Sequence, residues 1–418
     1  MSIYDKASLI QIPSGYKAGK LYSVIPNSVA GDFTHTRSGV ATRVNPQGLI
    51  EDVSSNVPRL DYPFIDGEVQ DCPHLLLEPQ RTNNTAYSED FSSWGDVGVT
   101  ITSSAIVSPD GTTNASKLVS TANNWRKSSS FSGSAGVTYT VSIYAKLDTS
   151  TSTTTTRLEV YNGAGSLAAD YNLLNETISN SGFTSVFIEP VEDDWYRIGG
   201  TYTAGGTNNI LYIYPSAGYG TAGTMYFWGA QQEAGSYPTS YIATEASFVT
   251  RLKDECSDGG DADLFNLTEG TLFVDTTPFT REATDRITLS NNNYNNRILI
   301  SKSSLTQLQF IVVSNNSTVA TYTTNVNYNE RNKIAITFKQ NEFKFYLNSS
   351  LVHTDTSGSV PTGLNDFSFK GIGSALYWNG KIHQAMMFKE ALSDSELETI
   401  TSYSSFNSMA TALGYKII

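Results

Sequence analysis

The phrase ATRVNPQGLIEDVSSNVPRLDY occupies residues 41–62, and CPHLLLEPQRTN follows at residues 72–83. A third phrase, WGAQQEAGSYPTSYIATEASFVTR, occupies residues 228–251, beyond a long stretch of alternating sequence. The phrases combine prolines, which interrupt helices and strands, with short apolar runs and scattered charges. None of these residues forms a pattern typical of chemistry on a substrate. We therefore interpret the phrases as segments with a structural role and look for functional residues elsewhere in the chain.

Between the phrases, apolar and polar residues alternate. The clearest example runs from Val137 to Leu147, where every second residue is apolar. Polar residues occupy most of the other face: Thr138, Thr140, Ser142 and Lys146. This alternation predicts an antiparallel strand with one face on a core. Several such segments, separated by glycine-containing turns, predict a β-sandwich over residues 85–252.

The quoted phrases, with AYSEDFSSW at residues 86–94, resemble a modular family of bacteriophage structural proteins. In that family a similar leader precedes a β-sandwich, and a similar closing phrase follows it. The resemblance covers residues 1 to about 251. It implies that residues 85–252 form a jelly roll similar to carbohydrate-binding modules.

A further β unit is predicted from residue 264 onward. In FKFYLN, the side chains of Phe343, Phe345 and Leu347 fall on one side of a strand. This hairpin strand, the segment WNGKIHQAMMF and a following short helix together resemble the concanavalin A-like or laminin-G-like lectin/glucanase fold over residues 264–403. One departure is that Ser349 and Ser350 stand where the hairpin usually has glycine.

The short helix has a local cause. Ser393 and Glu396 form an S-x-x-E capping box, and Leu392 with Leu397 forms a hydrophobic staple. A helix is therefore predicted to begin near Asp394.

The fold class that we predict is all-β, with two antiparallel β-sandwiches, a jelly roll and then a concanavalin A-like domain, after an extended N-terminal segment. The N-terminal docking segment covers residues 1–84, the jelly roll 85–252, a polar linker 253–263 and the lectin-like domain 264–418.

The segment 1–84 has little periodicity but carries apolar runs such as Leu75–Leu77. We expect these leucines to pack on a sister subunit or on the following sandwich, giving an oligomer, in the simplest case a trimer; a flexible tail is the alternative. Removing residues 1–84 should then leave soluble sandwiches.

Charge and composition exclude several classes of function. The chain has 27 Lys and Arg against 40 Asp and Glu, a net charge of −13. An acidic chain repels phosphate backbones, so we expect no nucleic-acid binding. No apolar run is long enough to span a membrane, and no secretory signal is visible. Cys72 and Cys256 are expected to be free thiols.

Candidate catalytic and metal sites are weak. Glycoside hydrolysis needs two carboxylates across one bond, and no strand of the C-terminal unit has the expected pattern. The cluster Glu189, Glu192, Asp193 and Asp194 is interpreted as a solvated turn, and the histidines His35, His74, His353 and His383 as packing or surface residues. Asp258, Asp261 and Asp263 lack the full calcium-loop pattern, so no metal site and no cofactor are predicted. A structural calcium held by non-local carbonyls would leave no signature in the sequence.

Glycan binding is the remaining chemistry. Sugar sites combine aromatic platforms with amide and hydroxyl groups. The loop around Tyr294, with Asn292 and Asn295, brings both together, and Trp125 and Tyr219 are further candidates in loops. A plain turn is the alternative at Tyr294, and Trp378 is expected in the core.

These observations predict a phage virion structural protein: a head or tail fibre, spike or decoration subunit that is assembled in the host cytoplasm. Its partners would be other virion proteins and host cell-surface polysaccharide. One alternative is a cellular carbohydrate-binding protein or adhesin. Another is a glycan-degrading enzyme with an unrecognised site.

Overall fold

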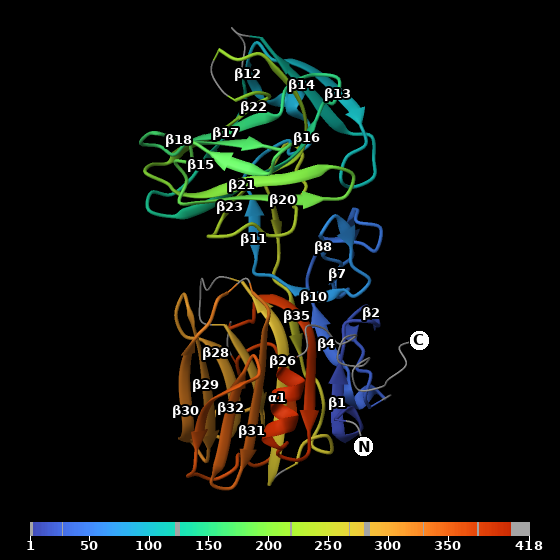
Figure 1. The fold of residues 1–418 in the computed structure, drawn as a ribbon, viewed down its shortest axis with the longest axis vertical. Helices are drawn as coiled ribbons and strands as arrows, with labels where there is room; N and C mark the ends of the chain where they lie inside the picture. Colours follow the sequence, from blue (N-terminus) through green and yellow to red (C-terminus); the bar gives the residue numbers. More distant parts are fainter. Residues whose placement is uncertain are drawn as a thin grey trace.

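The computed structural model describes residues 3–26, 28–121, 126–217, 220–266, 268–279, 285–328, 330–373 and 376–402. Two β-sandwiches are stacked end to end, and the N-terminal residues run beside the lower sandwich and up to the junction (Figure 1). The all-β prediction is confirmed.

The first sandwich consists of two six-stranded antiparallel sheets. One sheet has the order β12 (Gly95–Val97), β15 (Arg126–Ser132), β22 (Asn208–Tyr214), β17 (Thr155–Tyr161), β18 (Ser166–Asn172) and β19 (Thr177–Ser179). The other has the order β13 (Thr100–Ile106), β14 (Ala115–Ser120), β23 (Gly223–Ala234), β16 (Thr138–Leu147), β21 (Trp195–Thr203) and β20 (Ser185–Val191). Apolar residues from both sheets, among them Val141, Ile143 and Leu211, form one core between them.

The alternation predicts β16 correctly, and the structure shows in addition that residues on its polar face are buried. Thr140 and Ser142 are each 1% exposed. The hydroxyl of Thr140 donates to the carbonyl of Gly235, and the Ser142 hydroxyl accepts from Arg197. Residues from the closing phrase and from the leader, among them Tyr241 and Ile50, cover this side of the sheet. Alternation alone could not reveal this second covering layer.

The second sandwich pairs an eight-stranded sheet with a five-stranded sheet. The larger sheet has the order β33 (Ser350–Asp355), β32 (Glu342–Leu347), β31 (Asn332–Lys339), β26 (Glu269–Pro278), β35 (Gly380–Phe388), β10 (His74–Leu77) and β7 (Leu60–Asp61), with β1 (Ala7–Gln11) also on β35. The smaller sheet has the order β30 (Ser317–Asn325), β29 (Gln307–Ser314), β28 (Arg297–Lys302), β27 (Arg286–Ser290) and β34 (Asp366–Ser368).

The N-terminal segment completes this second sandwich. Along one edge of β35, β1 pairs with residues 385–388 and β10 pairs with residues 380–382. Leu9, Leu75 and Leu77 are at most 1% exposed and belong to the core of the second sandwich. The segment therefore packs mainly on the sandwich that follows last in the sequence. Removing residues 1–84 would take away strands and core side chains of the second sandwich, so soluble sandwiches are no longer the expected product of that truncation.

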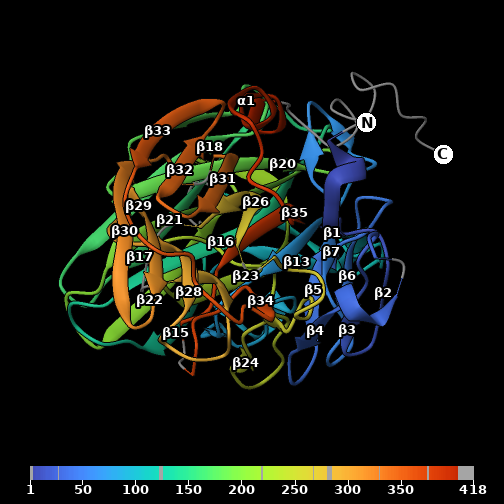
Figure 2. The ribbon, with the colours of Figure 1, turned by 90° about the horizontal axis from the view of Figure 1, so that it is seen from below.

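The rest of the N-terminal segment forms small sheets beside the junction (Figure 2). These contain β2 (Tyr16–Lys17), β3 (Lys20–Leu21), β4 (Phe33–Thr36), β5 (Ala41–Val44), β6 (Ile50–Val53), β8 (Phe64–Ile65) and β9 (Glu68–Val69). The strands β11 (Arg81–Asn83) and β24 (Val249–Arg251) pair where the chain enters and leaves the first sandwich. Short 3-10 helices occupy Tyr4–Lys6, Val29–Gly31 and Phe91–Ser93.

The segment 253–263 is only partly the solvated linker that the sequence predicts. Asp261 and Asp263 are exposed. However, Asp254 and Cys256 are buried, and β25 (Glu255–Ser257) pairs with β4 of the N-terminal segment. The polar composition of this segment suggested a solvated linker. Asp254 can nevertheless be buried because it has charged partners inside the protein.

The helix α1 (Asp394–Ser402) begins where the capping box predicts. The backbone N–H and the hydroxyl of Ser393 both donate to Oε2 of Glu396, at 2.9 and 2.7 Å. Leu392 and Leu397 lie in one apolar cluster on the outer face of the larger sheet. No helix within the described ranges is both long and apolar enough to cross a bilayer.

Candidate functional site

The loop around Tyr294 joins β27 to β28 and presents an aromatic ring to solvent. Tyr294 is 49% exposed. Its hydroxyl donates to the carbonyl of Ile372 at 2.6 Å, and the guanidinium of Arg297 lies 5.2 Å from the ring centroid. The ring is thus held in one orientation by Arg297 at the start of β28 and by Ile372 from a distant segment of the chain. A fixed, exposed ring of this kind can stack against the apolar face of a sugar.

The two asparagines predicted beside Tyr294 are in the same loop and are exposed. Asn292 adopts a left-handed conformation with φ of 60°, and its side-chain amide donates to Oδ1 of Asn365 at 3.4 Å. The backbone of Asn295 is used by the turn, since its N–H donates to Oδ1 of Asn293 at 2.8 Å. The loop is therefore a well-bonded turn that also places amides around a ring.

The other aromatic candidates have different outcomes. Trp125 and Tyr219 lie outside the described residues. Trp378 is fully buried, and its indole N–H donates to Oγ1 of Thr276 at 3.1 Å, which confirms the prediction that it is a core residue.

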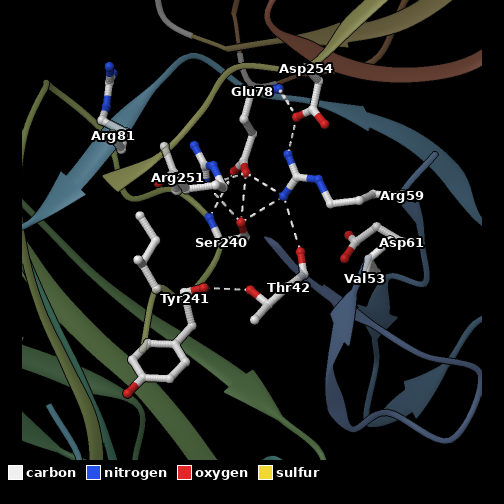
Figure 3. A network of polar contacts seen from close by, with 12 residues as sticks. Thr42, Val53, Arg59, Asp61, Glu78, Arg81, Ser240, Tyr241, Arg251 and Asp254 are labelled. Carbon is white, nitrogen blue, oxygen red and sulfur yellow. Dashed lines mark hydrogen bonds and ion pairs between the residues drawn. The ribbon is translucent and has the colours of Figure 1, made fainter. Parts of the chain in front are cut away.

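A buried network of charges lies where the N-terminal segment meets both sandwiches (Figure 3). Arg59 donates at once to Glu78, at 2.7 Å, and to Asp254. Arg251 donates to the same oxygen of Glu78 at 2.6 Å, and the Ser240 hydroxyl bonds Glu78 as well. The side chains of the two arginines and the two carboxylates are at most 3% exposed.

Electrostatics explains why these charges persist in the interior. Burial acts to raise the pKa of Asp254, but the charge of Arg59 and further partners hold that pKa well below its usual range. Burial likewise acts to raise the pKa of Glu78, yet Arg251 and Arg59 leave the pKa lowered. Both carboxylates are therefore ionised and compensated. The carboxylate oxygens are engaged by partners within the chain, so this network holds the parts of the chain together.

Sequence reasoning missed this network although all its members except Asp254 stand in the quoted phrases. Arg59 belongs to VPRLDY, Glu78 to LLLEPQ, and Ser240 and Arg251 to the closing phrase. The phrases contain charged residues although no chemistry is expected of them. Since buried charges need partners, these residues were the available sign of an internal charge network.

A cavity of about 470 Å³ opens between the two sandwiches and the N-terminal segment. Its walls include Tyr62 and Phe64 from the N-terminal segment, Arg197 from β21, and Lys381 from β35. We call it the junction cavity. A neighbouring cavity of about 500 Å³ shares Glu189, Pro238, Phe279 and Lys381 with it.

A histidine pair lies near the junction cavity on the outer face of the larger sheet. The rings of His74 and His383 are 5.6 Å apart. Nε2 of His74 lies 3.0 Å from Oδ2 of Asp61, and Nε2 of His383 lies 3.0 Å from Oγ1 of Thr277. Burial lowers the pKa of both histidines, that of His383 strongly. Both are neutral packing groups at pH 7, as the sequence predicts for each of them.

The acidic cluster after β20 is a turn. Asp193 and Asp194 adopt left-handed conformations, and Asp193 is ion-paired with Lys146 at 2.9 Å. Within the described ranges no group of three or more His, Cys, Asp or Glu side chains is arranged to hold a metal ion. Cys72 is exposed and Cys256 is buried, and neither forms a disulfide, as expected.

Comparisons with known proteins address the second sandwich. Residues 263–398 match the sequence model of the concanavalin A-like lectin/glucanases superfamily. No curated protein matches the chain.

Several solved structures resemble part of this chain, with low sequence identity and low TM-scores. The carbohydrate-binding module CBM40 of the Ruminococcus gnavus IT-sialidase, bound to α2,3 sialyllactose, is 17% identical, with 34% of this chain and 86% of that chain covered and a TM-score of 0.30. Domain 4 of AbnA, a GH43 extracellular arabinanase from Geobacillus stearothermophilus in complex with arabinotriose, is 14% identical, with 40% and 84% covered and a TM-score of 0.30. These values are too low to carry an argument about this chain. The family match stands by itself, and residues 263–398 form a concanavalin A-like domain.

Proposed function

We propose that this protein is a non-catalytic structural protein that binds glycans through the loop around Tyr294. The observation that carries the proposal is the fixed, 49% exposed ring of Tyr294 among exposed amides, on a domain of concanavalin A-like fold. A single stacked ring contributes on the order of 1 kcal/mol, so each site is weak and several copies act together.

The test is a binding measurement with the variant Tyr294→Ala. Immobilised host-surface polysaccharides should capture the wild-type protein, and the variant should bind roughly fivefold to tenfold more weakly, as expected for the loss of one stacking contact. Its thermal unfolding midpoint should be unchanged. Tyr22→Ala is the matched control, because Tyr22 is a 36% exposed tyrosine of the N-terminal segment. Equal binding by Tyr294→Ala and the control would refute the site.

The finer part of the proposal is a phage virion subunit of a head or tail fibre, spike or decoration, made in the host cytoplasm. It is supported by the resemblance of residues 1–251 to phage structural proteins. The N-terminal segment also exposes apolar side chains that suit docking: Val24, Val29, Val40 and Ile65. Leu75–Leu77 are buried within the chain and are not free to contact a sister subunit. In a trimer, these exposed residues would have to form the contacts between subunits. Mass photometry of the purified protein and proteomics of phage particles would test both; a monomer would contradict the trimer, and absence from particles would contradict the virion role.

A glycan-degrading enzyme is the second candidate, and one carboxyl group favours it. Burial raises the pKa of Asp366 to about 6, the range of a general acid, and Asp258 lies near enough to act on it electrostatically. Against this, both Asp366 oxygens accept from the Ser368 hydroxyl at 2.9 Å, and Asp366 is only 6% exposed. Incubation with host polysaccharide should leave its chain length unchanged. Release of oligosaccharide that Asp366→Asn abolishes would establish the enzyme instead.

A further inference from the structure

Two cations, Arg197 and Lys381, stand in the wall of the junction cavity without a direct ion pair. Arg197 is 8% exposed, and its guanidinium makes hydrogen bonds with the Ser142 hydroxyl, at 3.0 and 3.3 Å. Among the ion pairs of the described residues, none joins Arg197 or Lys381 to a carboxylate. By contrast, the buried cations Arg59, Arg251 and Lys302 each contact a carboxylate. Burial acts to lower the pKa of Arg197, but Tyr144 and carboxylates beyond contact distance, among them Glu189, leave that pKa raised.

The carboxylates in the cavity wall are already engaged. Asp61 accepts from the backbone N–H of Val44 at 2.8 Å and bonds His74. Glu78 belongs to the buried network, where it neutralises Arg59 and Arg251. Glu189 is exposed and stands opposite Arg197 in the β20–β21 pairing, yet it makes no ion pair with it. The cavity wall therefore presents two cations that lack a direct ion pair, and Glu189 acts on Arg197 only electrostatically.

The cavity also has aromatic walls. Tyr62, Phe64 and Phe279 are half-buried and line it. Phe279 packs on Tyr237 with ring centroids 5.1 Å apart, which fixes its position. Rings that are partly exposed inside a cavity can cover the apolar faces of sugar rings. A volume of about 470 Å³ is within the range of small-ligand sites, roughly 300–1,000 Å³.

We propose that the junction cavity is a second binding site, distinct from the Tyr294 loop, and that its ligand is a carboxylate-bearing oligosaccharide. Arg197 and Lys381 take the ligand carboxylate, and the rings of Tyr62, Phe64 and Phe279 take the apolar sugar faces. Arginine and lysine bind carboxylates through charge-assisted hydrogen bonds, which are the strong class. Because the N-terminal segment, β21 and β35 all contribute to the walls, the ligand would contact every part of the molecule at once.

The experiment measures binding by calorimetry with the full-length protein and two probes, trigalacturonate and the neutral galactotriose. Trigalacturonate should bind, and galactotriose should bind at least tenfold more weakly. Lys381→Gln should lower the affinity for trigalacturonate by about tenfold, the usual scale of one charge-assisted contact. Lys389→Gln is the matched control, since it makes the same change of charge at an exposed residue just beyond the end of the same strand. Equal losses in the two variants, or equal binding of the two probes, would overturn the proposal.

Two further arms keep the test decisive. Glu189→Gln removes the carboxylate that acts electrostatically on Arg197 and should strengthen trigalacturonate binding, because the ligand carboxylate no longer competes with it; weaker binding would count against the site. Inorganic phosphate as competitor should displace trigalacturonate only weakly, and full displacement at equal concentration would show a simple anion site and overturn the saccharide assignment. Tyr294→Ala should leave trigalacturonate binding in the cavity unchanged, so a failure of the Tyr294 site and a failure of this site give different results.

Discussion

Arg37 and Asp254 are 217 residues apart in the sequence, and Nη1 of Arg37 donates to Oδ1 of Asp254 at 3.0 Å with both side chains fully buried. Asp254 also bonds Arg59 and accepts from the backbone N–H of Glu78 at 3.0 Å. One carboxylate thus connects two parts of the N-terminal segment to the start of the second sandwich. This arrangement makes the junction a single cooperative unit.

Replacing Asp254 by Asn should destabilise the protein by about 3–5 kcal/mol, because it leaves the buried charges of Arg37 and Arg59 without compensation. Urea unfolding followed by tryptophan fluorescence measures this loss. Asp263→Asn, at an exposed position, should change the free energy of unfolding by less than about 0.5 kcal/mol. Equal stabilities of the two variants would contradict the role of the junction.

Deleting residues 1–84 should give an aggregated product. The deletion uncovers the edge of β35 that pairs with β1 and β10, and an unpaired edge promotes association between chains. Sedimentation of the expressed protein checks this outcome. A soluble, folded fragment would show that the second sandwich does not need the N-terminal strands.

Leu75→Ala should lower the free energy of unfolding by about 2–5 kcal/mol, because Leu75 is fully buried in the core of the second sandwich. Leu174→Ala is a suitable control, since Leu174 is 64% exposed. The comparison by thermal or urea unfolding separates a core role of Leu75 from a docking role. A loss no greater than that of the control would place Leu75 outside the core.

The stability of the protein should depend on Asp366 between pH 5 and pH 7. Burial raises the pKa of Asp366 to about 6, so the folded state binds its proton more tightly than the unfolded state does. Stability from this group is therefore fully present below the unfolded pKa and falls as pH rises toward and through 6. Relative to Asp366→Asn, the wild type should lose about 1 kcal/mol between pH 5 and pH 7. Identical pH profiles of the two proteins would contradict the raised pKa.

Ser393→Ala should cost about 1 kcal/mol, the usual contribution of a helix N-cap. The substitution removes the hydroxyl that donates to Glu396 at the start of α1. Ser402→Ala, at the exposed end of the same helix, should have a smaller effect. Hydrogen exchange of the α1 amides reports the change locally, and equal exchange in the two variants would argue against the cap.

The sequence by itself determined the local structure. The alternation from Val137 to Leu147 predicted β16, the capping box predicted the start of α1, and Trp378 was expected in the core. These features depend on neighbouring residues, which is why a periodic pattern or a short motif can reveal them. The composition of the Tyr294 loop likewise indicated an exposed ring among amides.

Only the tertiary structure decided which distant segments meet. The pairing of β1 and β10 with β35 joins residues more than 300 positions apart, and no local pattern encodes such a partner. The contacts of Arg37, Arg59 and Glu78 with Asp254 or Arg251 arise in the same way. The junction cavity, with Arg197 and Lys381 in its wall, exists because these long-range contacts bring the two sandwiches together. Charge compensation and strand pairing depend on which residues are close in space. A single sequence can therefore identify residues that need a partner, but it does not show which residue the partner is.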